Sequence, residues 1–157
     1  MKTIRNFSYG GAAAIVTSMA LIVGLDAATA TKWTILGGLL IVGVADNLTD
    51  SLSVHIYQES EHLDGREAFL STLTNFGTRL VISLSFVALV LLLPTGSAIV
   101  ASLAWGLLLL VGLTWALAHE RRQPVVPEVL KHVAVALTVI LVSVGIGAWI
   151  GEHVGTG

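Results

Sequence analysis

The chain contains no cysteine and few charged residues. Of its 157 residues, 11% are charged and 55% are hydrophobic, whereas soluble domains carry about 25% charged residues. The absence of cysteine excludes a disulfide framework and a thiolate metal site. The net charge of −2 does not indicate a nucleic-acid partner. These absences predict an integral membrane protein.

The apolar residues fall into long runs separated by short polar breaks. A membrane-spanning helix needs about 20 mostly apolar residues. Five segments meet this requirement, and we expect spans at 9–29, 33–57, 69–93, 98–118 and 128–150. The sequence therefore predicts an all-α integral membrane protein with five transmembrane helices in a single domain, 1–157.

Lysine and arginine are distributed unequally between the expected loops. With the N-terminus inside, seven of the eight basic residues fall in or next to cytoplasmic segments, and only Lys32 falls outside. This bias predicts a cytoplasmic N-terminus and an outside C-terminus. The expected location is the cell (inner) membrane.

The first apolar segment has an alternative interpretation. A charged start and an apolar run precede Ala28–Ala30, which is similar to a signal-peptidase site. Cleavage there would leave four spans with the same charge pattern.

Two aspartates interrupt the second apolar segment. At about 100° per residue, one helical face holds Gly43, Asp46, Asp50, Ser53 and Tyr57. The opposite face holds Ile41, Ala45, Leu48, Leu52 and Ile56. Because that face suits lipid or an apolar neighbour, we expect the aspartates to turn into the bundle, where Gly43 allows another backbone to come close.

Arg79 lies in the third expected span at a depth similar to that of the two aspartates. An ionised residue at mid-membrane costs about 2.5–3.5 kcal/mol, so we expect Arg79 to pair with one of them. The trio would carry a charge of −1. Either the pair is structural and one aspartic acid is neutral, or the cluster is a cation or proton site on a transport path. The relay residues would be Asp46, Asn47, Asp50, Ser53 and Arg79.

A second candidate site lies at the end of the same segment. His55, Glu59 and His62 follow the spacing i, i+4 and i+7, which places them on one helical face. Imidazole with carboxylate suits iron, zinc or manganese. Together with Asp46 and Asp50, these residues form the predicted metal-ligand set; the alternative is a solvated helix end.

Polar and small residues predict helix contacts. Ser71, Thr74, Asn75 and Thr78 precede Arg79. They line the same cavity as Asp46 or form hydrogen bonds within the bundle, and both interpretations stay open. Small residues recur every four positions at Gly10, Ala14 and Ser18, and again at Ser143, Gly147, Gly151 and Gly155. This spacing is typical of close helix packing.

Three stretches carry a resemblance to a known family. These are "GGAAAIVTSMALIVGLDAAT", "GGLLIVGVADNLTDSLSVHIYQESE" and, near the C-terminus, "HVAVALTVILVSVGIGAWIG". The chain resembles the vacuolar iron transporter family, in a short form that lacks its cytoplasmic metal-binding domain. The resemblance implies a homodimer that exports ferrous iron, and often manganese, from the cytosol against protons, with a pore at the dimer interface.

The resemblance carries over position by position only in part. Asp46 keeps the acid of the family's second helix, and Thr49 stands for a serine. Ala13 stands where the family has an aspartate, Asp50 where it has a methionine, and Val54 where it has a glutamate. A carboxylate oxygen in place of a thioether sulfur suits manganese or magnesium better than a soft metal.

The expected function is transport of a divalent cation, iron or manganese, out of the cytosol. The alternatives are a non-transporting membrane scaffold with a structural Asp–Arg cluster, and a carrier for protons or a small solute. No nucleophile–base set or phosphate-binding glycine loop is present, so no enzyme is expected. The expected partners are the lipid bilayer, a second copy of the chain and the transported cation, with no resident cofactor.

Overall fold

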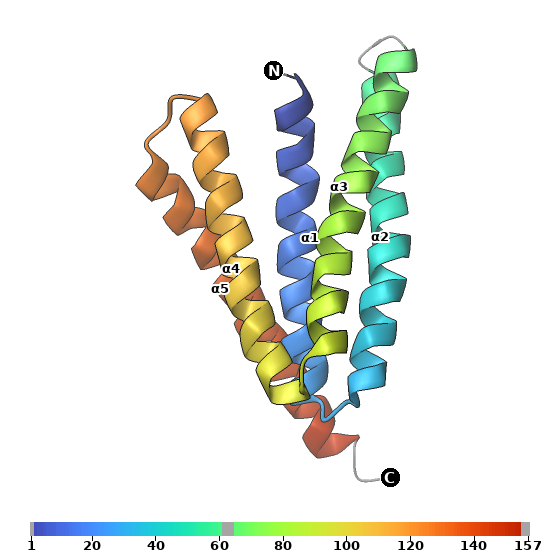
Figure 1. Cartoon of the computed structure of the whole chain (residues 1–157), viewed down its shortest axis with the longest axis vertical. Helices are drawn as coiled ribbons and strands as arrows, with labels where there is room; N and C mark the ends of the chain where they lie inside the picture. Colours follow the sequence, from blue (N-terminus) through green and yellow to red (C-terminus); the bar gives the residue numbers. More distant parts are fainter. Residues whose placement is uncertain (1, 61–64, 155–157) are drawn as a thin grey trace.

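The structure is a computed structural model that describes residues 2–60 and 65–154, apart from the side chains of residues 2–10, 59 and 67. Within these ranges the chain forms five helices and no strand. They are α1 (Lys2–Ala27), α2 (Lys32–Ser60), α3 (Gly65–Leu92), α4 (Thr95–Glu120) and α5 (Val125–His153). Neighbouring helices run in opposite directions, so α1 begins and α5 ends at opposite ends of the bundle (Figure 1).

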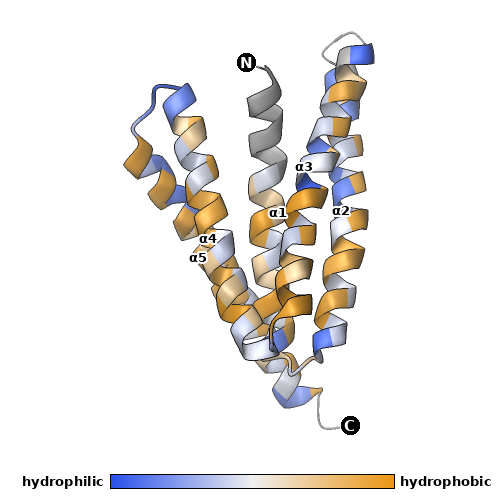
Figure 2. Cartoon of the chain, viewed as in Figure 1, coloured by the Kyte–Doolittle hydropathy of each residue, from blue (hydrophilic) through white to orange (hydrophobic). Residues whose placement is uncertain are grey.

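The helices have the length and composition of membrane spans. Among the described residues, α2 to α5 each contain a segment long and apolar enough to cross a membrane, whereas the apolar part of α1 is the shorter Gly11–Ala27. Hydrophobic residues predominate along the middle of the helices, whereas hydrophilic residues lie mainly toward the helix ends and, in addition, midway along α2 and α3 (Figure 2). The expected all-α membrane class is thus supported, while the count of five spans and their orientation remain predictions.

Proline and left-handed residues mark where helices begin and where the chain turns. Pro94 precedes α4 and Pro124 precedes α5; proline suits a helix start, because it has no N–H to leave unpaired there. Thr29 has φ 60° and Arg122 has φ 54°, a region that non-glycine residues rarely adopt. At Thr29 the backbone N–H bonds back to Asp26 O at 2.8 Å, which closes the end of α1.

Helix α1 is the centre of the bundle. It lies between the α2–α3 pair and the α4–α5 pair (Figure 1) and contacts all four other helices. Ile15, Met19 and Ile22 of α1 are almost fully buried, and they belong to the same apolar core as Phe86 of α3 and Leu110 of α4. The buried face of α1 therefore joins the two helix pairs.

The crossing of α1 and α5 depends on small residues, and the four-residue spacing on α5 predicted its side of the contact, whereas on α1 the contact lies at Gly24 and Ala27. A Cβ atom added at Gly147 would lie 2.0 Å from the carbonyl oxygen of Gly24, and one added at Gly151 would lie 3.2 Å from that of Ala27. Ser143 lies against Gly24 in the same crossing. These positions bring the two backbones together.

Lys32, the single basic residue expected on the outer side, has a structural role. Its Nζ donates hydrogen bonds of 2.9 Å to Leu91 O and to Leu93 O at the end of α3. Carbonyls at a helix end have no partner within the helix. Lys32 therefore ties the start of α2 to the end of α3.

We expect Lys32→Met to lower the free energy of unfolding by about 1–3 kcal/mol, because two charge-assisted hydrogen bonds are lost. Thermal unfolding in detergent would measure the change. Lys131→Met is the control, since Lys131 is 69% exposed and pairs with Glu128 on its own helix, an arrangement worth about 0–1 kcal/mol. Equal effects of the two substitutions would contradict the role given to Lys32.

Candidate functional site

The boundary between α2 and α3 changes character along its length. Toward the start of α2 it is apolar, with Leu39 and Phe86 buried in the core. Toward the end of α2 it is polar. Six of the nine buried polar side chains of the described residues lie on these two helices, namely Asn47, Ser51, Gln58, Asn75, Arg79 and Ser83. Buried polar groups in a membrane are costly unless paired, so the candidate site lies here.

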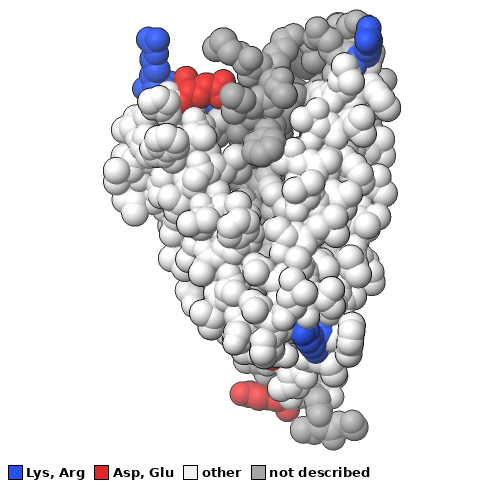
Figure 3. Space-filling model, viewed as in Figure 1, with Lys and Arg blue, Asp and Glu red and all other residues white. Residues whose placement is uncertain are grey.

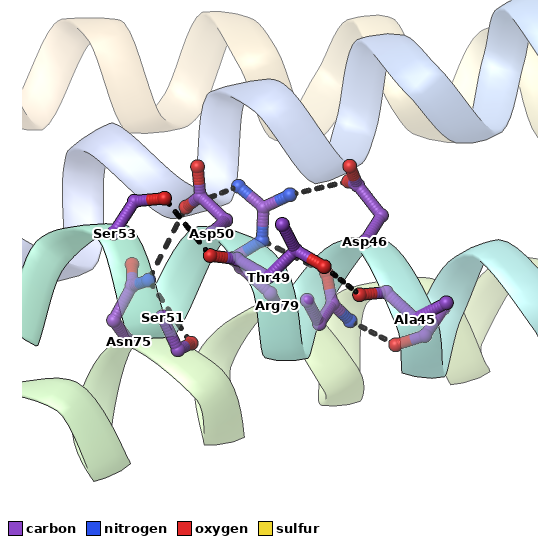
Figure 4. Close-up of polar contacts among 10 residues, drawn as sticks. Ala45, Asp46, Thr49, Asp50, Ser51, Ser53, Asn75 and Arg79 are labelled. Atoms are coloured by element: carbon purple, nitrogen blue, oxygen red, sulfur yellow. Dashed lines mark hydrogen bonds and ion pairs between the residues drawn. The ribbon is translucent and has the colours of Figure 1, made fainter.

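Arg79 is the centre of this region. Its side chain is 2% exposed and forms two ion pairs, from Nη2 to Asp46 Oδ2 at 2.6 Å and from Nη1 to Asp50 Oδ2 at 2.9 Å. Its Nε donates to Asn47 Oδ1 at 2.8 Å (Figure 4). The expected depth of Arg79 is confirmed, but the expectation of one partner was wrong: the guanidinium fork reaches both carboxylates, which lie one turn apart on α2.

Two asparagines hold this arrangement. Asn47 accepts from Arg79 and donates through Nδ2 to the carbonyl oxygen of Gly43, so both ends of its amide are bound. Asn75 Nδ2 lies 3.4 Å from Asp50 Oδ2 and 3.4 Å from Ser51 Oγ. Both asparagines are buried, and they restrict the positions of the guanidinium and of Asp50.

The close approach that Gly43 was expected to allow is present. A Cβ atom added there would lie 3.2 Å from Ser83 Cβ, so α3 packs tightly against this point of α2. That contact helps to fix the register of the two helices just beyond Arg79.

The two aspartates lie at the edge of the bundle and not in its interior. The Asp46 side chain is 47% exposed and that of Asp50 is 43% exposed. The expectation that they turn inward was wrong, because the buried stripe of α2 is centred on Asn47 and Ser51. The opposite face is exposed and apolar as expected, at Ile41, Leu48, Leu52 and Ile56.

The carboxylates are only partly engaged. Both ion pairs and the Asn75 contact use Oδ2 atoms; no described residue donates a hydrogen bond to Oδ1 of Asp46 or Asp50. Two aspartates and one arginine give the cluster a formal charge of −1. On the face drawn in Figure 3, the charged side chains of the described residues gather at the two ends of the molecule. The cluster thus carries excess negative charge midway along two apolar helices.

Ser53, predicted as a relay residue, is not part of the cluster. Its hydroxyl is exposed and donates to Thr49 O at 3.0 Å on its own helix. Thr49 in turn donates to Ala45 O at 2.9 Å. Both hydroxyls therefore satisfy the backbone of α2.

The predicted metal ligands are brought together only in part. His55 Nδ1 lies 3.3 Å from Thr72 Oγ1 on α3. The Glu59 side chain and His62 lie outside the described residues, so the predicted set of three is not tested. Among the side chains that are described, no three His, Asp or Glu residues form a group that could hold a metal ion. Asp46 and Asp50 supply two carboxylates, and no third described ligand residue lies with them.

The polar residues before Arg79 mostly bond within the bundle. Ser71 Oγ accepts from Gln58 Nε2 at 2.6 Å, and the Thr74 hydroxyl donates to Leu70 O at 2.8 Å. Only Asn75 reaches the cluster. The contact of Gln58 with Ser71 and that of His55 with Thr72 were missed, although the recurrence of polar residues every three or four positions on α2 could have indicated them.

Comparison with known proteins gives no match: no family model, no curated protein and no solved structure matches this chain. The resemblance to vacuolar iron transporters therefore remains a prediction. At two positions where that family has acids, Ala13 is exposed and Val54 is half-buried, and neither side chain adds a ligand atom.

Proposed function

We propose that this chain is a membrane transporter for a divalent cation, with iron and manganese as its substrates. The observation that carries the proposal is the pair of half-exposed carboxylates, Asp46 and Asp50, beside the buried Arg79. Ionisable residues inside a membrane are costly and generally mark a functional path. The net charge of −1 and the two Oδ1 atoms that no described residue engages would attract a cation, and carboxylate oxygens suit manganese and iron(II).

A homodimer would supply what one chain lacks. A carboxylate midway along an apolar span cannot face lipid at low cost, so a second copy of the chain is the proposed cover. Two clusters of charge −1 sum to −2, which balances one divalent cation. The dimer would then offer the cation four carboxylates, whereas a single chain offers two. Five spans in the inner membrane, with the N-terminus inside and the C-terminus outside, belong to the same proposal, and the lysine and arginine bias supports this orientation.

The proposal predicts that Asp46→Asn abolishes ion flux while the protein stays folded. The substitution removes one carboxylate and leaves Arg79 with Asp50 as a neutral pair. Flux of Fe²⁺ and Mn²⁺ into proteoliposomes, measured with and without a proton gradient, tests it.

Asp26→Asn is the control, because Asp26 is an exposed aspartate near the end of α1 and should not affect flux. No flux of either ion through folded native protein would overturn the proposed function. Equal flux through the native and Asp46→Asn proteins would overturn the role of Asp46.

A second candidate is a non-transporting membrane scaffold in which the cluster is structural. The observation that favours it is the pairing of Arg79 with both aspartates and with Asn47, which already compensates most of the buried charge. Folded native protein without flux would support this candidate.

A further inference from the structure

A second polar feature leads from the cluster toward the end of α2. We call it the α2–α3 polar seam, and it consists of Ser51, His55 and Gln58 on α2 with Ser71, Thr72 and Asn75 on α3. Three contacts cross it: Asn75 Nδ2 to Ser51 Oγ at 3.4 Å, His55 Nδ1 to Thr72 Oγ1 at 3.3 Å, and Gln58 Nε2 to Ser71 Oγ at 2.6 Å. The Asp46–Arg79–Asp50 cluster follows directly beyond Asn75.

On α2 the residues of successive contacts are about one helical turn apart, because Ser51 and His55 are separated by four positions and His55 and Gln58 by three. On α3, Ser71 and Thr72 are adjacent, and Asn75 follows three positions after Thr72. Side chains three or four positions apart have Cβ atoms about 5–6 Å apart. A water molecule with two hydrogen bonds of about 2.8 Å bridges polar atoms separated by about that distance. A water molecule between each two successive contacts would make the seam a continuous chain of hydrogen bonds.

The middle of the seam borders a groove between α2 and α3. The groove has a volume of about 450 Å³, and its lining includes Ser51, His55 and Thr72. Its other walls are the apolar side chains of Leu48, Leu52, Phe69, Leu73 and Phe76. The polar atoms that line the groove therefore belong to the middle of the seam.

The seam also contains a buried acceptor that no described residue engages. Gln58 Oε1 is buried, and no described residue donates a hydrogen bond to it. Buried polar atoms without a protein partner are commonly satisfied by water. Gln58 lies next to the end of α2, where bulk water would enter.

We propose that the α2–α3 polar seam is a hydrated inlet that connects the end of α2 with the Asp46–Arg79–Asp50 cluster. The inlet closes beyond the cluster, where Ser83 packs against Gly43 and Phe86 is fully buried. Hydration of the seam does not depend on transport. The further step, that a small cation from that side reaches Asp50 through the inlet, rests on the proposed function.

Because the chain has no cysteine, one introduced thiol reports water access at one position. Ser51→Cys and Ser83→Cys are matched variants: both serines are buried, at 3% and 5% exposure, on opposite sides of Arg79. Full-length protein in vesicles of both orientations is treated with a charged, membrane-impermeant methanethiosulfonate reagent. We expect Ser51→Cys to react from the side where α2 ends, and Ser83→Cys to stay unreactive from both sides.

Thr72→Cys is a second test from the other helix, in case Ser51→Cys does not fold, and Ser60→Cys at the exposed end of α2 shows that the reagent reaches the protein. A cationic reagent should modify Ser51→Cys faster than an anionic one, and Asp50→Asn should reduce that difference.

If Ser51→Cys and Thr72→Cys are folded and unreactive while Ser60→Cys reacts, the inlet is refuted. Reaction of Ser83→Cys at the rate of Ser51→Cys would also refute it. Labelling without ion flux would retain the inlet and overturn only the proposed function.

Discussion

The Arg79→Met protein is expected to lose about 3–5 kcal/mol of folding free energy, because removing the buried guanidinium leaves two carboxylates without a counter-charge between apolar helices. Arg79 is the cation that holds two aspartates midway along apolar helices. Without it, the cluster changes from a formal charge of −1 to −2. Unfolding followed through the fluorescence of the four tryptophans would measure the loss.

A neutral cluster separates the effect of charge from that of packing. The triple variant Arg79→Met, Asp46→Asn, Asp50→Asn removes all three charges and keeps the side-chain volumes similar. Replacing a complete buried ion cluster by neutral groups is often tolerated, so we expect this protein to regain most of the stability that Arg79→Met loses. If the triple variant is as unstable as Arg79→Met, the loss comes from packing and the electrostatic explanation is wrong.

The Gly147→Val protein is expected to lose the α1–α5 crossing. A Cβ atom at this position would lie 2.0 Å from Gly24 O and 3.0 Å from Ala27 Cβ. Backbone atoms cannot move away as a flexible side chain can, so the two helices would have to separate. Overpacking costs about 1–3 kcal/mol and occasionally more; we expect the upper end or beyond, measured as a lower unfolding temperature and faster proteolysis.

Gly145→Val is the matched control, because it lies on the same helix and a Cβ there would meet nothing within 4 Å. Both substitutions add the same side chain and the same loss of backbone freedom. Only Gly147→Val should destabilise strongly. A similar loss for both would attribute the effect to helix propensity and not to the crossing.

The sequence predicts the helices well and the site less well. Long apolar runs, broken at polar segments such as "PTGS", define helices because few other structures satisfy a backbone in lipid. The depth of Arg79 could be counted from the helix ends, and its pairing with the aspartates was found. The small-residue spacing at Ser143 and Gly147 indicated the contact that α5 makes with α1.

The placement of the aspartates could not be predicted, since a helical projection shows which residues share a face but not which neighbour covers it. The projection placed the aspartates at the centre of the inward face, whereas the structure buries Asn47, one position after Asp46. The contact of Gln58 with Ser71 depends on the register between two helices, which packing such as that of Gly43 against Ser83 determines. Function depends on the site and not on the fold, so the transported ion has to be measured.

The central position of α1 has a consequence for how the protein is made. α1 is synthesised first, but α5, which crosses it, begins at Val125, 98 positions after Ala27. At about 5–20 residues per second, that delay is about 5–20 s. The α2–α3 pair can form during this time, while the small-residue face of α1 is open to other chains in the membrane. Assembly would therefore not follow the order of synthesis, and docking of the last helix onto the first would complete it.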